Sequence, residues 1–593
     1  MKKTIILLTI AAVAALGANA AEQRMVRISG CPFEMPPIAE VTNPDRDFPV
    51  TDYGARPDGT KCTAAFAAAM AACEKAGGGR VVVPDGRWVT GAIRFRSNCT
   101  LYLAEGAVLV FTDDPADYPE VFTTWEGIEC YNHSPLLYAF ECSNVAITGK
   151  GLIAPKMDLW RDVWSYRPPS HMAATEQLYY WCSTNAPVAS RRLLALKDSH
   201  MRPHLIQFNR CRNVLLDGFR IKESPFWMIH LYHSENCIVR NLETYAHGHN
   251  NDGVDVDMTR NVLIEGCRFD QGDDGIVLKA GRNADAWRLN RPTENVVIRN
   301  CDLVSSHSLL GIGSELSGGI RNVWMTGCRV STTFNMLRIK TGRRRGGFVE
   351  NVWLDHCTAK DVRSVFNLFT QYCAQWGAFP DFEIRYTRIR NINVSDCTCV
   401  RAKTGVLLEG DRHLPASEIT IRNVKVGEVT EKMTEIVNCH GVRLDGLELG
   451  YPDPHLMLPS SIDVAKAAVW AERSPAYAKA VEFLRRADFK SLACGRHELG
   501  EGVVAEIRET SLVPLTERKD SIVDRGHDTI YRLVQGKEYM LCTGPQQDFH
   551  YAGGAMLFKI PAGLEYSPDR TNKRATDVRV CEVKIPSGAG RTR

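Results

Sequence analysis

The sequence lacks a clear membrane-spanning segment near its start. The apolar run at residues 5–16 is shorter than the roughly 20 residues that a transmembrane helix needs. Two lysines precede this run, and Ala18-Asn19-Ala20 follows it as a small-residue cleavage site. We therefore expect residues 1–20 to be a signal peptide rather than an uncleaved anchor, no membrane span, and a mature protein that is periplasmic or secreted.

The sequence also lacks an excess of charge of either sign. Its 72 Lys and Arg residues and 69 Asp and Glu residues give a net charge of +3. Removal of the two lysines in residues 1–20 leaves 70 basic and 69 acidic residues, a net charge of +1. A chain this close to neutral is not expected to bind nucleic acid through a general basic surface. A local basic site for an acidic sugar is compatible with it.

Cysteine is too sparse for a dense disulfide scaffold, with 20 residues in a chain of 593. Many of these cysteines recur at one position of a repeated phrase, which favours a role as small buried hydrophobic residues. His247-Gly248-His249 has the spacing of a metal-binding pair, but no Cys or third His stands at ligand spacing. We expect neither a metal nor a cofactor.

A short phrase recurs between residues 142 and 439. It begins with Asn and a β-branched residue, alternates apolar residues, and ends on Cys; one copy is Asn295-Val296-Val297-Ile298-Arg299-Asn300-Cys301. From Cys267 onward the cysteines are 34, 27, 29 and 40 residues apart, within the range of solenoid repeats. The alternation indicates strands rather than helices. One strand cannot bury its apolar face alone, but stacked coils can. We therefore predict an all-β parallel β-helix over residues 21–455. A propeller of WD40 type would need signatures that are absent.

The N-terminal part of this domain reads as a cap on the solenoid. Residues 63–74 are rich in alanine and predict a helix, which three glycines end at residues 77–79. Residues 80–84 predict the first strand. A cap of this kind is what the terminal coil of a solenoid needs.

Polar residues that a core does not need are concentrated in the middle coils. They are Asp252, Asp273, Asp274, His307, Arg338 and Lys340. Adjacent coils stack about 4.8 Å apart, so residues in the same phase line up on one face. We expect these six residues to share one groove.

This combination of residues suits the hydrolysis of an acidic sugar. Carboxylates that lie close together raise one another's pKa, which leaves a protonated acid beside ionised bases. Glycoside hydrolysis requires such a pair. The nearby Arg and Lys side chains suit a sugar carboxylate, Arg through paired hydrogen bonds and Lys as a point charge.

The order of the motifs closely resembles glycoside hydrolase family 28, the polygalacturonase family. The family signatures stand here as Asn250-Asn251-Asp252, Gly272-Asp273-Asp274, His307-Ser308 and Arg338-Ile339-Lys340. Asn251 replaces a Thr of the family pattern, and Ser308 replaces a Gly. The resemblance extends over residues 47–450 and implies a right-handed, pectin-lyase-like β-helix.

The resemblance also implies a role for each residue. Asp273 would be the general acid, Asp252 and Asp274 would hold and deprotonate the attacking water, and His307 would orient or tune the acid. Arg338 and Lys340 would bind the substrate carboxylate. Apart from these family roles, we also consider Asn250 and its neighbour His249 as candidates for substrate contact. The family inverts configuration, so we expect the acid and base to be separated by roughly 6.5–9.5 Å.

Other segments resemble the exo-acting bacterial branch of the family, among them residues 312–319 and 343–347. The long insertion at residues 160–191 could close one end of the groove. We therefore expect release of galacturonic acid from the ends of galacturonan chains. A rhamnogalacturonan galacturonohydrolase, a polysaccharide lyase and a non-catalytic sugar-binding solenoid remain as alternatives, and the oligomeric state is left open.

Three further polar groups have simpler interpretations. Asp255 and Asp257 alternate along the strand that follows Asp252, and we interpret them as turn-stabilising or exposed carboxylates. The arginines at positions 343–345 are interpreted either as a solvated basic turn or as substrate contacts.

Residues 456–593 predict a second, smaller α+β domain. Residues 462–489 have helical spacing, and strand patterns follow from residue 497. The phrase Gly495-Arg496-His497-Glu498-Leu499 weakly resembles the YhcH-type cupin-like family. The metal-binding Glu-x-His of that family is missing near residues 521–523, which implies a degenerate domain without a metal.

Overall fold

The structure is a computed structural model of the whole chain. It describes residues 24–165, 168–372 and 383–450, and in the C-terminal part residues 479, 482–483, 492–515, 521–524, 529–532, 538–543, 554–559 and 576–584. The predicted signal peptide lies outside the described residues. No helix among those described is long and apolar enough to cross a membrane.

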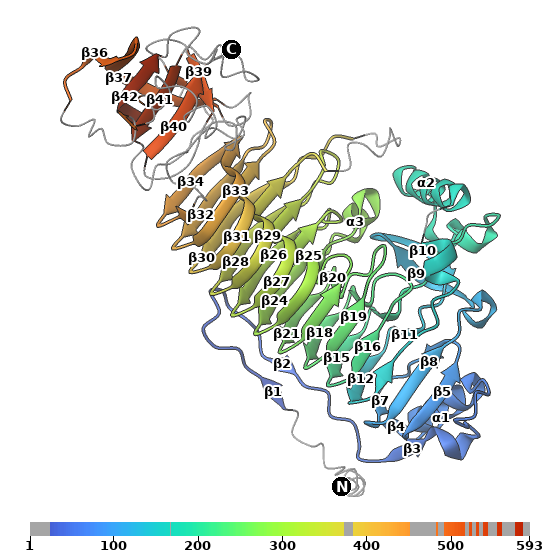
Figure 1. Cartoon of the computed structure of the whole chain (residues 1–593). Helices are drawn as coiled ribbons and strands as arrows, with labels where there is room; N and C mark the ends of the chain where they lie inside the picture. Colours follow the sequence, from blue (N-terminus) through green and yellow to red (C-terminus); the bar gives the residue numbers. More distant parts are fainter. Residues whose placement is uncertain are drawn as a thin grey trace, which may run out of the picture.

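The described chain winds into the predicted parallel β-helix, whose coils follow one another along a single axis (Figure 1). One long sheet holds thirteen strands: β3 (Asp47–Pro49), β4 (Gly79–Val83), β7 (Cys99–Leu103), β12 (Ser143–Gly149), β15 (Arg212–Asp217), β18 (Glu235–Arg240), β21 (Arg260–Glu265), β24 (Thr293–Arg299), β26 (Ile320–Thr326), β28 (Phe348–Asp355), β30 (Arg388–Ser395), β32 (Ala416–Arg422) and β34 (Cys439–Asp445).

The second long sheet carries the functional residues. Its strands are β5 (Gly86–Thr90), β6 (Ile93–Arg94), β8 (Ala107–Phe111), β11 (Leu137–Phe140), β13 (Leu152–Ile153), β14 (Ile206–Asn209), β16 (Arg220–Lys222), β17 (Ile229–Tyr232), β19 (Glu243–Ala246), β20 (Val254–Asp257), β22 (Arg268–Gln271), β23 (Ile276–Lys279), β25 (Asp302–Gly313), β27 (Arg329–Lys340), β29 (Thr358–Phe369), β31 (Thr398–Glu409), β33 (Lys425–Val437) and β35 (Glu448–Leu449). All pairings between neighbouring coils in this sheet are parallel, as in β20 with β23 and β25 with β27.

The Asn of the repeated phrase forms a ladder along the first sheet. Each of these residues has a positive φ, for example 58° at Asn295, a left-handed conformation that Asn tolerates better than most residues. The side-chain amide of Asn295 donates to Asn261 at 3.0 Å and accepts from Asn322 at 3.0 Å. The ladder therefore turns the chain into each strand and joins successive coils.

The interior is filled by the apolar residues of the repeat. The cysteines that end the phrase, including Cys267, Cys301, Cys328 and Cys357, are buried and not disulfide-bonded. Their interpretation as small core residues is confirmed. The predicted N-terminal helix is also confirmed: α1 (Thr63–Lys75) packs Phe66, among others, against the end of the core.

A second layer covers part of the outer face of the solenoid. It consists of the hairpin of β9 (Glu120–Trp125) and β10 (Ile128–His133), helix α2 (Pro169–Ser183) and helix α3 (Asn283–Leu289). These elements share a separate hydrophobic cluster with Phe226 and Trp227. The insertion expected at residues 160–191 thus contains helix α2 and a π-helical turn at Trp160–Trp164.

The C-terminal part contains an antiparallel sheet that is separate from the two long sheets. It is built from β36 (Gly495–Gly500), β37 (Val503–Leu515), β38 (Ser521–Asp524), β39 (Thr529–Arg532), β40 (Glu538–Thr543), β41 (Gly554–Lys559) and β42 (Thr576–Lys584). Most of the helix predicted at residues 462–489 lies outside the described residues, as does the expected boundary near residue 455.

Candidate active site

Three carboxylates meet where two successive coils turn toward the second sheet. Asp252 lies just before β20, and Asp273 and Asp274 lie in the turn between β22 and β23. One oxygen of each carboxylate lies within 4.8 Å of the others. Parallel stacking produces this proximity, because the backbone N–H of Gly253 donates to the carbonyl of Asp274 at 2.9 Å. The structure thus brings together the three acids that the sequence pattern predicted.

Two of the predicted basic residues contact this trio directly. The ammonium of Lys340 donates to Oδ2 of Asp274 at 2.8 Å, and Nδ1 of His307 lies 3.0 Å from Oδ1 of Asp273. Arg338, two residues before Lys340 on β27, places its guanidinium over the ring of Tyr372 at 5.5 Å. Ser308, which replaces a Gly of the family pattern, has no positive φ and lies buried in β25. The backbone at this position therefore does not require glycine.

The two remaining predicted residues, His249 and Asn250, are held by Arg202, which the sequence did not point to. The buried Arg202 guanidinium donates to the backbone carbonyl of His249 at 2.8 Å and to Oδ1 of Asn250 at 3.0 Å. Asn250 has a φ of 60°, and the side chain of Asn251 donates to the carbonyl of Ser224 at 2.7 Å. These contacts fix the loop that carries Asp252. No motif in the sequence identifies Arg202, because its partners lie about two coils away.

The three acids differ in exposure and in acidity. Exposed fractions of the side chains are 21% for Asp273, 4% for Asp252 and 0% for Asp274. Burial and the neighbouring Asp273 charge raise the pKa of Asp252 well above its usual value. Burial is also the largest single effect on the other two and acts in the same direction. For Asp273, the hydrogen bond and charge of His307 together with Lys340 outweigh it, so the pKa is lowered. For Asp274, the charge and hydrogen bond of Lys340 together with Arg338 and Lys279 lower the pKa. Of the three, Asp252 is therefore the carboxyl whose surroundings favour the protonated form.

The acids are close together. Their nearest oxygens lie within 4.8 Å of one another, because adjacent coils impose the inter-strand spacing on residues of the same phase. The expected separation of roughly 6.5–9.5 Å refers to the carboxyl groups of the acid and the base and stays a prediction. Within the described residues, this trio is also the set close enough to bind one cation. Lys340 already provides a positive charge there.

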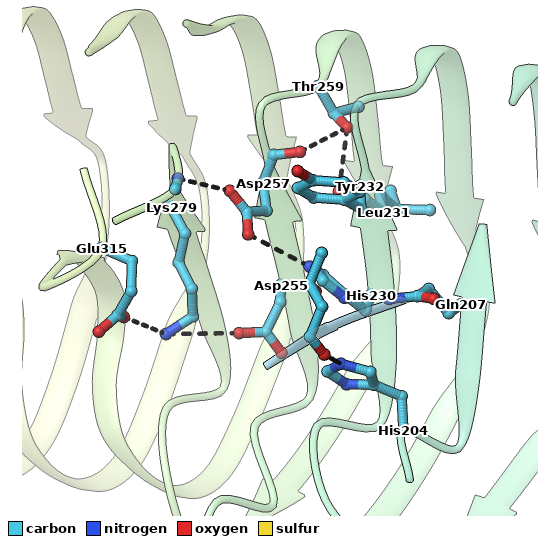
Figure 2. Close-up of polar contacts among 12 residues, drawn as sticks. His204, Gln207, His230, Leu231, Tyr232, Asp255, Asp257, Thr259, Lys279 and Glu315 are labelled. Atoms are coloured by element: carbon cyan, nitrogen blue, oxygen red, sulfur yellow. Dashed lines mark hydrogen bonds and ion pairs between the residues drawn. The ribbon is translucent and has the colours of Figure 1, made fainter. Parts of the chain in front are cut away.

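A buried polar network lies beside the trio (Figure 2). The ammonium of Lys279 is 3.7 Å from Asp252, 3.5 Å from Asp255 and 3.4 Å from Glu315, and 4.3 Å from the centre of the Trp227 ring. The Lys279 side chain is 5% exposed. Burial of an ammonium is unfavourable without carboxylates nearby, and burial of the carboxylates is equally unfavourable without a cation.

Asp255 and Asp257 are fully buried, so the interpretation of them as exposed carboxylates is wrong. Asp257 accepts from the backbone N–H of Gly281 at 2.8 Å and lies 3.3 Å from Nε2 of His230 (Figure 2). Burial raises the pKa of Asp257 to about 7. The same burial lowers the pKa of His230 well below its usual value, which keeps this imidazole neutral.

The hairpin β9–β10 explains why the outer face of the sheet is buried at Asp255 and His230. The hydroxyl of Thr123, on β9, donates to Gln207 at 2.8 Å, and Gln207 contacts Nδ1 of His230 at 3.0 Å. At the other edge, the backbone N–H of Arg282 donates to the carbonyl of Gly127, between β9 and β10, at 2.9 Å. The hairpin therefore lies over the outer face of β14, β17 and β20, next to the carboxylates.

An ionic chain joins this hairpin to the network around Lys279. The Arg282 guanidinium lies 3.3 Å from Glu126 in the hairpin turn and 2.7 Å from Glu315. It also stacks on the ring of Tyr179 from α2 at 4.2 Å, and the Tyr179 hydroxyl donates to Glu126. The hairpin and helix α2 are thus connected through Arg282 and Glu315 to Lys279, beside the carboxylate trio.

The basic turn at positions 343–345 is solvated at Arg343 but not at Arg345. Arg345 is buried, with Nε donating to the carbonyl of Ser314 at 2.9 Å and a terminal nitrogen donating to Asn283 at 2.8 Å. Arg343 forms an ion pair with Asp411 at 2.8 Å. These arginines hold neighbouring loops together.

Comparisons with known proteins identify relatives of the β-helix. A family model described as Glycosyl hydrolases family 28 matches residues 189–445. The crystal structure of a hyperthermoactive exopolygalacturonase from Thermotoga maritima is 35% identical, with a TM-score of 0.64 over 69% of this chain and 94% of that chain. A Vitis vinifera protein named "Probable polygalacturonase" is 26% identical over 424 residues, which cover 69% of this chain and 80% of the relative. An exo-poly-alpha-D-galacturonosidase from Dickeya chrysanthemi is 24% identical over 409 residues, 64% of this chain and 67% of the relative.

Proposed function

The chain belongs to glycosyl hydrolase family 28 and is a glycoside hydrolase of the polygalacturonase type, and we propose that it removes galacturonic acid from the ends of α-1,4-linked galacturonan chains. The observation that carries this proposal is the trio of carboxylates within 4.8 Å, flanked by His307 and Lys340 in a β-helix. Pectin and its oligosaccharides are the source of such chains.

Asp273 is the carboxyl that we assign as the general acid. It is the most exposed of the three and therefore the one that a glycosidic oxygen can reach. A bound sugar displaces water from Asp273 and brings a second negative charge close to it, and both effects raise the pKa of a carboxyl. Asp273 can then carry the proton that it donates to the glycosidic oxygen.

The reaction follows from this placement of the proton. Asp273 gives its proton to the glycosidic oxygen as the bond from that oxygen to C1 breaks, and a water oxygen forms the new bond to C1. The proton of the water passes to Asp252 or Asp274, both of which lie beside Asp273. Lys340 keeps Asp274 ionised, so the pair retains a site for that proton.

The hairpin β9–β10 and helix α2 support the exo-acting mode. Their residues Glu126 and Tyr179 meet Arg282 immediately after β23, so protein occupies the space beside Lys279 and Asp252 at this end of the site. A chain that lies across the carboxylates would have to end there. The substrate would extend in the opposite direction, toward the later coils.

The first experiment is the time course of products from defined oligogalacturonides, resolved by chromatography. We expect monomeric galacturonic acid from the start and chains that shorten by one unit at a time. Mid-sized oligomers would retain the hydrolase and reject the exo mode, 4,5-unsaturated products would mean a lyase, and activity only on rhamnogalacturonan would change the substrate.

The Asp273→Asn variant separates an enzyme from a sugar-binding solenoid. We expect a loss of turnover of about 10²–10⁴-fold, the contribution of general acid catalysis, with oligogalacturonide binding retained in calorimetry. Asp270→Asn is the matched control, because Asp270 lies on the neighbouring strand β22 and pairs with His247 instead. Equal loss in both variants would contradict the assignment of Asp273.

Two further parts of the proposal have direct tests. We also propose that the enzyme inverts configuration at C1, as the family resemblance implies; this requires the β-anomer of galacturonic acid as the first product, which proton NMR resolves before mutarotation. Export requires removal of residues 1–20, which N-terminal sequencing of the mature protein detects. An α-anomer, or an intact N-terminus on the exported protein, would contradict the respective part.

A further inference from the structure

A row of side chains extends from the catalytic acids toward the later coils. In the parallel register, Ser306 and Ser308 of β25 pair with Thr333 and Asn335 of β27, which places His307 beside Phe334. Thr333 and Asn335 pair in turn with Val362 and Ser364 of β29, which places Phe334 beside Arg363. These strands follow one another along the solenoid (Figure 1). The row therefore advances by one coil, about 4.8 Å, at each step.

The members of the row stack on one another. The rings of His307 and Phe334 are 4.5 Å apart and inclined by 15°, and the Arg363 guanidinium lies 4.1 Å from the centre of the Phe334 ring. Both faces of the phenyl ring are thus occupied, although Phe334 remains 36% exposed. The ring fixes the position of the guanidinium, because a cation is attracted to the face of an aromatic ring.

Arg363 differs from the other exposed arginines nearby in what it contacts. Arg329 on β27 pairs with Asp302 at 4.0 Å, and Arg401 on β31 pairs with Asp361 at 2.5 Å. Asp361 lies two residues before Arg363 on the same face of β29, yet it is used by Arg401. No carboxylate in the described part of the chain forms an ion pair with Arg363.

Arg338 has the same kind of environment as Arg363. Its guanidinium also rests on an aromatic ring, that of Tyr372 at 5.5 Å, and it too has no ion pair with a carboxylate of the described residues. The family resemblance assigns Arg338 to the substrate carboxylate. A guanidinium held by a ring keeps its hydrogen-bond donors available for an incoming carboxylate, whereas one paired with Asp does not.

We propose that Arg363, held in place by Phe334, binds the carboxylate of a galacturonate unit beyond the cleaved linkage and extends the substrate site by about two coils from His307. This inference rests on the proposed function. It also agrees with the proposed direction of the substrate, because the hairpin β9–β10 lies on the side of the earlier coils (Figure 1). A digalacturonate would end before Arg363, and a longer chain would reach it.

The test is the dependence of kcat/KM on chain length. For Arg363→Ala, we expect the ratio of kcat/KM on hexagalacturonate to kcat/KM on digalacturonate to fall about tenfold, the loss of one charged hydrogen-bonding contact. Arg363→Lys should restore part of the ratio, because it keeps the charge and loses the paired geometry. Arg329→Ala is the matched control: it also removes an exposed Arg of this sheet, and it should keep the wild-type ratio.

The outcomes distinguish this inference from the proposed function. A wild-type ratio in Arg363→Ala would overturn the inference alone, and so would an equal fall in Arg329→Ala. A wild-type enzyme that releases nothing from any oligogalacturonide would overturn the proposed function, and the inference with it. If Arg363→Ala does not fold, Arg363→Gln preserves the stem over Phe334 and carries the same test.

Discussion

Replacement of Lys279 by methionine removes the one ammonium that lies among Asp252, Asp255 and Glu315. These contacts are 3.7, 3.5 and 3.4 Å long, and the four side chains are at most 7% exposed. Methionine has a similar volume and keeps the contact with the ring of Trp227. The variant therefore tests the charge rather than the packing.

The expected loss is large because the partners stay buried. Removal of one member of a buried ion pair typically costs about 3–5 kcal/mol, since the other charge is left without compensation. Asp252 and Asp255 already have pKa values raised by burial and can take up protons, which limits the loss. We therefore expect a decrease of about 3 kcal/mol in the free energy of unfolding at pH 7.

The loss should depend on pH in a defined direction. Despite burial, Lys279 and two arginines hold the pKa of Glu315 well below its usual value, so this group stabilises the fold above its unfolded pKa of about 4.3. That contribution disappears as the pH falls through the folded pKa. The pKa values of Asp252 and Asp255 are raised, and without Lys279 their ionisation at neutral pH costs more. The difference between Lys279→Met and wild type should therefore be largest near pH 7 and shrink toward pH 4.

Urea unfolding followed by tryptophan fluorescence at pH 7 and pH 4 measures both effects. Lys61→Met is the matched control, because Lys61 pairs with Asp117 at the surface and should contribute less than about 1 kcal/mol. A Lys279→Met variant as stable as Lys61→Met at pH 7, or equally destabilised at both pH values, would refute the reasoning.

Two further predictions concern the acid and the coil ladder. In His307→Ala, loss of the hydrogen bond that favours ionised Asp273 should raise the pKa of that carboxyl, and the alkaline limb of the pH profile of kcat/KM should move to higher pH; an unchanged limb would exclude this tuning. Asn295→Ala should lower the free energy of unfolding by about 2 kcal/mol, and Asn295→Gly by about half of that, because Gly accepts the positive φ and loses only the bonds to Asn261 and Asn322. Urea unfolding checks this order, and equal losses would contradict it.

The solenoid could be predicted because its signals are local and repeated. Each coil needs a residue that tolerates a left-handed conformation before the strand, and Asn295 and its equivalents meet that need in the sequence itself. Each coil also needs small apolar residues inside, and the cysteines stand at one phase of the repeat. The catalytic trio follows from the same register, since Asp252 and Asp273 are brought together by stacking alone.

The network around Lys279 could not be predicted in this way. The alternation of Val254, Asp255, Val256 and Asp257 is what a strand with one face in water would show. Here the second face is covered by the hairpin β9–β10, which is separated from β20 by more than a hundred residues in the chain. A period of two identifies the inward face of a strand, but it does not reveal what a distant segment places on the outward face.

The covering hairpin links the specificity of the site to its electrostatics. By occupying the space beside β20, it limits the substrate on one side in the proposed mode of action and also removes water from Asp255, Asp257 and Lys279. Removal of water raises the pKa values of Asp255 and Asp257. It also makes the Lys279 charge necessary, because this ammonium compensates the buried carboxylates beside it, Asp252 among them. An enzyme of this fold that lacked the hairpin would have an open groove and a solvated outer face on β20. The same segment therefore underlies the proposed release from chain ends and the burial that raises the pKa values of Asp255 and Asp257.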